Sequence, residues 1–227
     1  MLVHTLRDRQ RAEKLTGGKV LGAFPKESSL RYRRYNKAIN DMAMRHLSKT
    51  LLPYFKDNQQ NVLNLLSTEE GNGKSMLASV LEVFWNSIGL VVRKIAYDED
   101  FLTEDSKYVM ASSVKDLCPD LQPNEILIVE YPNLSEHSIS PALLNMGTVN
   151  LLVSRANRAW KNTDQQMYKK LMDMLDNKED LFIYLTQADR SSVEEFTGQL
   201  PPYTPFKNFV YRMSQLGLTA VENKHTK

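Results

Sequence analysis

Short apolar runs alternate with helical patterns along most of this chain. The apolar runs predict strands over residues 20–25, 62–67, 91–97, 125–131, 149–155 and 181–186. Apolar residues at helical spacing predict helices within residues 1–19, over 28–55, 74–88 and 163–176, and near 141–146, 191–197 and 207–216. Buried strands separated by helices indicate an α/β fold, with a mostly parallel sheet covered by helices on both faces.

A glycine-containing turn, STEEGNGKS (residues 67–75), joins the second predicted strand to the helix after it. This is the context of a phosphate-binding loop (P-loop), and it predicts a P-loop NTPase-like domain. Gly71 and Gly73 let the backbone approach an anion, towards which the free N–H groups at the helix start would point. Lys74 would add a positive charge for the outer phosphates, and the Ser75 hydroxyl is a natural Mg²⁺ ligand.

The turn departs at one position from the full motif GxxxxGK[ST], because Thr68 stands where the first glycine is expected. A polar turn that happens to contain Gly-Lys is the alternative interpretation. ATP and Mg²⁺ are the predicted cofactors, and these residues are predicted to contact the nucleotide: Thr68, Gly71, Asn72, Gly73, Lys74, Ser75 and Met76.

Acidic residues follow two of the predicted strands, at the edge where ligands bind in such sheets. Asp98 and Asp100 follow strand 91–97, and Glu130 lies at the end of strand 125–131. Asp98 and Glu130 are predicted metal ligands together with Ser75, and Asp98 and Asp100 are predicted catalytic residues together with Lys74. A solvated acidic turn is the alternative interpretation of Asp98 and Asp100.

Composition excludes several classes of protein. An apolar fraction of 42% and a charged fraction of 25% are typical of a globular protein with a sizeable core. No apolar run approaches the roughly 18–20 residues that span a bilayer, and no signal peptide is visible. The single cysteine, Cys118, excludes an intramolecular disulfide, and no Cys/His cluster has zinc spacing, so a reducing, cytosolic setting fits best.

The charge is uneven along the chain. Residues 1–60 hold 13 Lys and Arg against 5 Asp and Glu, a net charge of +8, and residues 61–227 hold 16 against 22, a net charge of −6. We therefore divide the chain into a basic leader with a long helix (1–60) and a P-loop nucleotide-binding domain (61–227). The leader suggests a nearby anionic surface, either lipid headgroups, nucleic acid or an acidic partner chain. A solvated basic helix explains the charge equally well.

Five segments together resemble the cytoplasmic domain of bacterial tyrosine kinases and of the polysaccharide co-polymerases that control capsule or exopolysaccharide chain length. The segments are EKLTGGKVLGAFPK (13–26), STEEGNGKS (67–75), RKIAYDED (93–100), EILIVEYP (125–132) and VNLLVSRANR (149–158).

The resemblance implies a Mg·ATP-dependent domain that regulates polysaccharide assembly, possessing or lacking tyrosine autokinase activity. It also implies a homo-oligomer at the cytoplasmic face of the bacterial inner membrane. Its expected partners are a membrane-spanning portion of the same or another polypeptide and the polysaccharide assembly machinery, with no nucleic acid.

Departures from the family's pattern leave two alternatives open. Leu102 replaces an arginine after the D-x-D motif, Glu130 and Asn133 alter the Walker B motif, and no tyrosine follows Tyr211 where the family has a tyrosine-rich tail. These changes favour a catalytically degenerate scaffold that uses nucleotide to set oligomeric state. The other alternative is a P-loop ATPase with water as acceptor, against which Glu69 argues, because related partitioning ATPases have a signature lysine near that position.

Overall fold

The computed structural model describes residues 5–27, 30–95 and 111–203. Within these ranges the chain forms a six-stranded sheet in which every pair of neighbours is parallel, in the order β1-β6-β5-β2-β4-β3. The strands are β1 (Val20–Pro25), β2 (Asn61–Leu66), β3 (Val92–Ile95), β4 (Ile126–Glu130), β5 (Val149–Arg155) and β6 (Leu181–Ala188). The predicted α/β fold with a parallel sheet is confirmed.

The centre of the sheet is buried on both faces. Every residue of β2 and β4 is buried, and so are the first six residues of β5. The edge strand β3 is only partly buried. The long apolar runs of β2, β4 and β5 follow from this position, because a strand covered on both faces needs apolar side chains on both.

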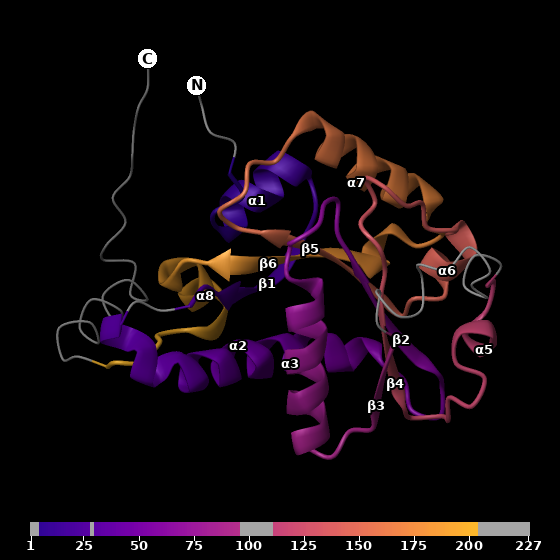
Figure 1. Ribbon diagram of the computed structural model, residues 1–227, viewed down its shortest axis with the longest axis horizontal. Helices are drawn as coiled ribbons and strands as arrows, with labels where there is room; N and C mark the ends of the chain where they lie inside the picture. Colours follow the sequence, from indigo (N-terminus) through magenta and orange to yellow (C-terminus); the bar gives the residue numbers. More distant parts are fainter. Residues whose placement is uncertain (1–4, 28–29, 96–110, 204–227) are drawn as a thin grey trace.

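Helices lie on both sides of the sheet (Figure 1), with α1 and α7 on one side and α2 and α3 on the other. The helices are α1 (Arg9–Thr16), α2 (Asn36–Leu51), α3 (Lys74–Ser87), α5 (Val114–Leu117), α6 (Pro141–Asn145), α7 (Asn162–Met174) and α8 (Arg190–Thr197). Short 3₁₀ helices are η1 (Leu30–Tyr35), η2 (Leu52–Tyr54) and η3 (Lys178–Asp180). No helix within the described ranges combines the length and the apolarity needed to cross a membrane.

The long helix predicted over 28–55, with Pro53 ending or kinking it, differs from the structure in its bounds. The structure has η1, then α2, then η2, with Pro53 inside the last 3₁₀ turn. Proline lacks the N–H that would continue the ladder of hydrogen bonds, so the α-helix ends before it. No side-chain cap marks the start of α2 at Tyr35, so the sequence has no signal for that boundary.

The helix predicted within residues 1–19 is short. It begins after Asp8, whose carboxylate accepts the N–H of Arg11, and it ends at Gly17, which has φ 76°. The single turn α5 lies where the sequence predicts no helix, and the helix predicted near 207–216 lies outside the described residues.

The predicted leader takes part in the sheet. β1 pairs with β6 along its length, and α2 and α8 pack against it. Residues 20–25, which the sequence analysis assigns to the leader, therefore form a strand of the same sheet as the P-loop-like domain. The division of the chain at residue 60 stays a prediction.

Candidate functional site

The turn between β2 and α3 has the backbone that its glycines predict. Gly71 has φ 66° and Gly73 has φ 89°, both in the left-handed region. No described atom lies within 4 Å of the point to which a Cβ of Gly71 would project. Helix α3 begins at Lys74, and no described side chain caps it at Gly73. The first N–H groups of α3 are therefore left for an external acceptor, as in an anion-binding helix start.

Lys74 is buried within this turn, with 8% of its surface exposed. Its Nζ donates to the Ser67 hydroxyl, which in turn donates to the carbonyl of Glu69. Burial lowers the pKa of Lys74, and the nearby carboxylates of Glu130 and Glu70 oppose that shift. A buried ammonium gains most from an additional anionic partner, which a phosphate group would supply.

Ser75 and Glu130 lie together at the ends of neighbouring elements. The Ser75 hydroxyl donates to a carboxylate oxygen of Glu130, which is 4% exposed. Glu130 ends β4 directly beside Leu65 of β2, so the register of the two strands places it at the loop. These two predicted metal ligands are brought together, while Asp98 and Asp100 lie outside the described residues.

Asn72 holds the turn against the sheet. Its side-chain oxygen accepts the backbone N–H of Arg155 at 3.3 Å, and its carbonyl accepts the Thr186 hydroxyl at 2.6 Å. Its amide also donates to the carbonyl of Glu69. The Asn72 side chain is thus engaged within the protein, so a predicted contact with nucleotide would use its backbone.

Met76 lies in the first turn of α3, two residues after Lys74. It lines a separate cavity of about 250 Å³ together with Phe24 and Val80, between α3 and β1. Its predicted contact with the nucleotide stays a prediction.

Thr68, at the position of the motif's first glycine, is 1% exposed. Its hydroxyl accepts Nη1 of Arg158 at 2.9 Å. Sequence reasoning missed Arg158 as well as Ser67 and Thr186. Arg158 lies 90 residues from Thr68 along the chain, and although it ends the segment VNLLVSRANR, nothing in that segment assigns it a role, and Thr186 lies in no motif.

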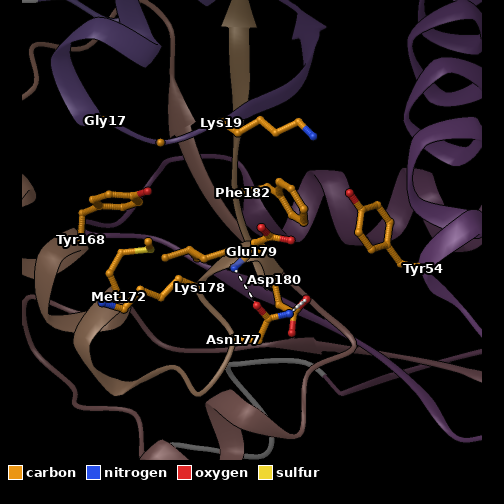
Figure 2. Close-up of a pocket in the computed structure, with 12 residues that line it drawn as sticks. Gly17, Lys19, Tyr54, Tyr168, Met172, Asn177, Lys178, Glu179, Asp180 and Phe182 are labelled. Carbon is orange, nitrogen blue, oxygen red and sulfur yellow. Dashed lines mark hydrogen bonds between the residues drawn. The ribbon is translucent and has the colours of Figure 1, made fainter.

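A second cavity, of about 540 Å³, lies at the opposite ends of the strands (Figure 2). It lies where β1 and β6 begin, with Tyr168 and Tyr54 on opposite sides of it and the segment 177–180 along one edge. Within this cavity the ring of Phe182 already has two partners. The ammonium of Lys19 lies over it, and the ring of Tyr54 packs against it in a T-shaped arrangement. Ligands of parallel α/β sheets bind beyond the carboxyl ends of the strands, so the turn at residues 67–75 is the stronger candidate site.

The comparisons with known proteins point to one fold. No family model matches the chain, and no curated protein matches it. Among solved structures it is similar to the kinase domain of the Escherichia coli tyrosine kinase Etk, with a TM-score of 0.55 and 11% identity over 88% of this chain and 99% of that one. It is also similar to the BceF tyrosine kinase domain, with a TM-score of 0.54 and 13% identity over 81% of this chain and 99% of that one. For the chimerical protein CapA2B2 the TM-score is 0.52, with 13% identity over 80% of this chain and 100% of that one.

These likenesses show the fold. The resemblance to bacterial tyrosine kinase domains, predicted from five sequence segments, is confirmed at that level, over most of the chain.

Proposed function

We propose that this chain is a Mg·ATP-binding domain of the bacterial tyrosine kinase type, which regulates the assembly of a capsular or extracellular polysaccharide. The fold shared with the Etk and BceF kinase domains supports the type of domain. The role in polysaccharide assembly is drawn from the sequence resemblance.

The main observation behind nucleotide binding is the burial of Lys74 in a turn in which Gly71 leaves space beside the backbone. Its ammonium group meets only a neutral hydroxyl, that of Ser67, within hydrogen-bonding distance among the described residues. Placing an ammonium there without a carboxylate bonded to it carries a desolvation penalty, which a phosphate group would offset.

The residues present fit Mg²⁺. Ser75 and Glu130 offer hard oxygen ligands side by side, and Mg²⁺ at a nucleotide is usually bound by one or two carboxylates besides phosphates and water. When bound, the ion would neutralise charge on the phosphate oxygens.

The residues of the chain then take separate roles. Lys74 stabilises the negative charge of the outer phosphates, and the first N–H groups of α3 bind the phosphate oxygens. Ser75, Glu130 and Asp98 hold the ion. Asp98 or Asp100 accepts the proton of the acceptor hydroxyl.

Equilibrium binding of Mg·ATP to the purified chain and to its Lys74→Ala variant tests the proposal. A hydrogen bond to a charged group contributes about 1.5–3 kcal/mol, so Lys74→Ala should weaken binding by roughly 10- to 100-fold. Lys169→Ala is the matched control, because Lys169 is an exposed lysine of α7. Equal affinity of wild type and Lys74→Ala would refute the proposed site.

Incubation with γ-labelled ATP separates the enzyme from its alternatives. Label on tyrosine, lost in Lys74→Ala, would establish the kinase, and free phosphate without labelled protein would establish an ATPase with water as acceptor. Neither product, from a chain that binds ATP, would establish a nucleotide-dependent scaffold. The contact of Ser75 with glutamate rather than with an aspartate favours this last alternative, because the longer side chain changes the geometry at the metal.

The proposal extends to partners and location. The domain would act as a homo-oligomer at the cytoplasmic face of the bacterial inner membrane, beside a membrane-spanning portion of the same or a partner polypeptide and the polysaccharide assembly machinery. The net charge of +8 on residues 1–60 supports a position beside anionic headgroups.

A further inference from the structure

Four charged side chains, here called the Arg158 cluster, lie against the P-loop: Arg158, Asp164, Glu69 and Lys161. Nη2 of Arg158 lies 2.6 Å from Oδ1 of Asp164 and 3.0 Å from Oε1 of Glu69. Nζ of Lys161 lies 2.7 Å from the same oxygen of Glu69. Nη1 of Arg158 donates to the Thr68 hydroxyl.

Arg158 is held in one place by this cluster. Its side chain is 7% exposed, and that of Asp164 is 1% exposed. The other carboxylate oxygen of Asp164 accepts the N–H of Lys161 at the start of α7. The guanidinium is therefore fixed to α7 on one side and bonds to the P-loop with two of its nitrogens on the other.

A buried ion pair of this kind contributes little net stability, since desolvation offsets much of the attraction. Its specific effect is on the loop, where residues 67 and 68 are held from the opposite side as well. The N–H groups of Leu134 and Ser135 donate to the carbonyls of Ser67 and Thr68. Removal of Arg158 would leave residues 67 and 68 attached to the protein on one side.

The contact between Arg158 and Glu69 also affects the charge of the loop. The loop carries two consecutive carboxylates, Glu69 and Glu70, next to a site for a polyanion, and like charges repel. Arg158 and Lys161 both contact Oε1 of Glu69, so they neutralise one of the two.

We propose that Arg158 is a positioning residue of the nucleotide site, which orders the loop through Thr68 and neutralises Glu69. The inference rests on the proposed function, because it assigns Arg158 to the same site. Arg158 acts through Thr68 and Glu69, and its contacts leave the phosphate itself to Lys74 and to the backbone.

The test compares Mg·ATP and Mg·ADP affinities of wild type, Arg158→Met, Arg158→Lys and Lys169→Met, well below the unfolding temperature of each. We expect Arg158→Met to weaken Mg·ATP binding at least tenfold and Mg·ADP binding less, because ATP carries more negative charge. Arg158→Lys should recover only part, since lysine lacks the planar fork that bonds Thr68 and Asp164 together. Lys169→Met is the matched control and should change affinity less than threefold, because Lys169 is an exposed lysine of α7 that lies outside the Arg158 cluster.

The double variant Glu69→Gln/Arg158→Met separates the two parts of the role. Recovery of ATP affinity relative to Arg158→Met would show that neutralisation of Glu69 dominates, and lack of recovery would show that the bond to Thr68 dominates. Amide hydrogen exchange of residues 67–75 adds a measurement without ligand, in which Arg158→Met should exchange faster there than Lys169→Met does.

Unchanged nucleotide affinity and unchanged exchange in Arg158→Met would overturn the inference while leaving the proposed function intact. A lower unfolding temperature with unchanged affinity would also overturn it, because that pattern indicates a purely structural residue. If wild type bound no nucleotide, the proposed function would fail and the nucleotide role of Arg158 with it, whereas the exchange comparison would still decide whether Arg158 orders the loop.

Discussion

Gly73→Ala is a substitution whose effect can be worked out from the geometry of the turn. Gly73 has φ 89°, and a Cβ there would lie 3.3 Å from Oγ1 of Thr186. The left-handed conformation costs a residue with a Cβ about 1–2 kcal/mol. The Thr186 hydroxyl would have to move from the carbonyl of Asn72, to which it donates at 2.6 Å, and a buried acceptor left unpaired costs a further ~1–3 kcal/mol. We expect a loss of about 2–5 kcal/mol in the free energy of unfolding.

Gly89→Ala is the matched control. Gly89 has the same φ of 89°, but no described atom lies within 4 Å of its Cβ position. It should lose only the backbone term of about 1–2 kcal/mol. Urea unfolding with equal m-values compares the two variants directly. The double variant Gly73→Ala/Thr186→Ala should then lose less than the sum of its single changes, since the crowded side chain is absent.

Equal destabilisation in Gly73→Ala and Gly89→Ala would refute this reasoning. It would mean that Thr186 yields without cost and that the bond between Thr186 and Asn72 does not hold the turn. Additivity in the double variant would likewise mean that the contact between Gly73 and Thr186 does not limit the residue at position 73.

Two further predictions concern stability. Gly18→Ala should lose about 1–3 kcal/mol from overpacking, because its Cβ would lie 2.5 Å from the Tyr168 hydroxyl oxygen, and Tyr168→Phe in the same chain should restore part of the loss in urea unfolding. Burial lowers the pKa of His46, whose Nε2 lies 3.2 Å from the carbonyl of Leu21, so the unfolded chain takes up a proton first as the pH falls. Stability should therefore fall as the pH drops below about 6.5, and His46→Gln should weaken that dependence. An NMR titration midpoint for His46 at or above 6.5 would contradict the sign.

Much of the sheet could be predicted because its strands are buried on both faces. β5 has the predicted bounds, 149–155, since the mostly apolar run VNLLV there is followed by the polar residues Ser154 and Arg155. The Lys74–Ser75 end of the loop was predictable too, because its chemistry lies within nine consecutive residues. The bounds of α2 were not, because Tyr35 has no capping side chain and the residues before it suit either helix type.

The parts of the site that could not be predicted depend on contacts between distant segments. Thr68 departs from the motif at a position usually held by glycine, and only the fold reveals that Arg158 bonds its hydroxyl. Asn72 reads as a loop residue facing a ligand, yet its side chain holds the backbone of Arg155. Such pairings follow from the strand order β5-β2-β4, which no local pattern encodes.

The pairing of β1 with β6 has a consequence for how the protein folds as it is synthesised. Val20 lies opposite Ile183 and Pro25 opposite Ala188, so within the described ranges the first strand pairs only with the last. A ribosome must deliver nearly all of the sheet before β1 can form its hydrogen bonds, and contacts so distant in sequence slow folding. Until then the apolar segment VLGAFP lacks its β partner, which makes it the segment that a nascent-chain chaperone would be expected to shield for longest.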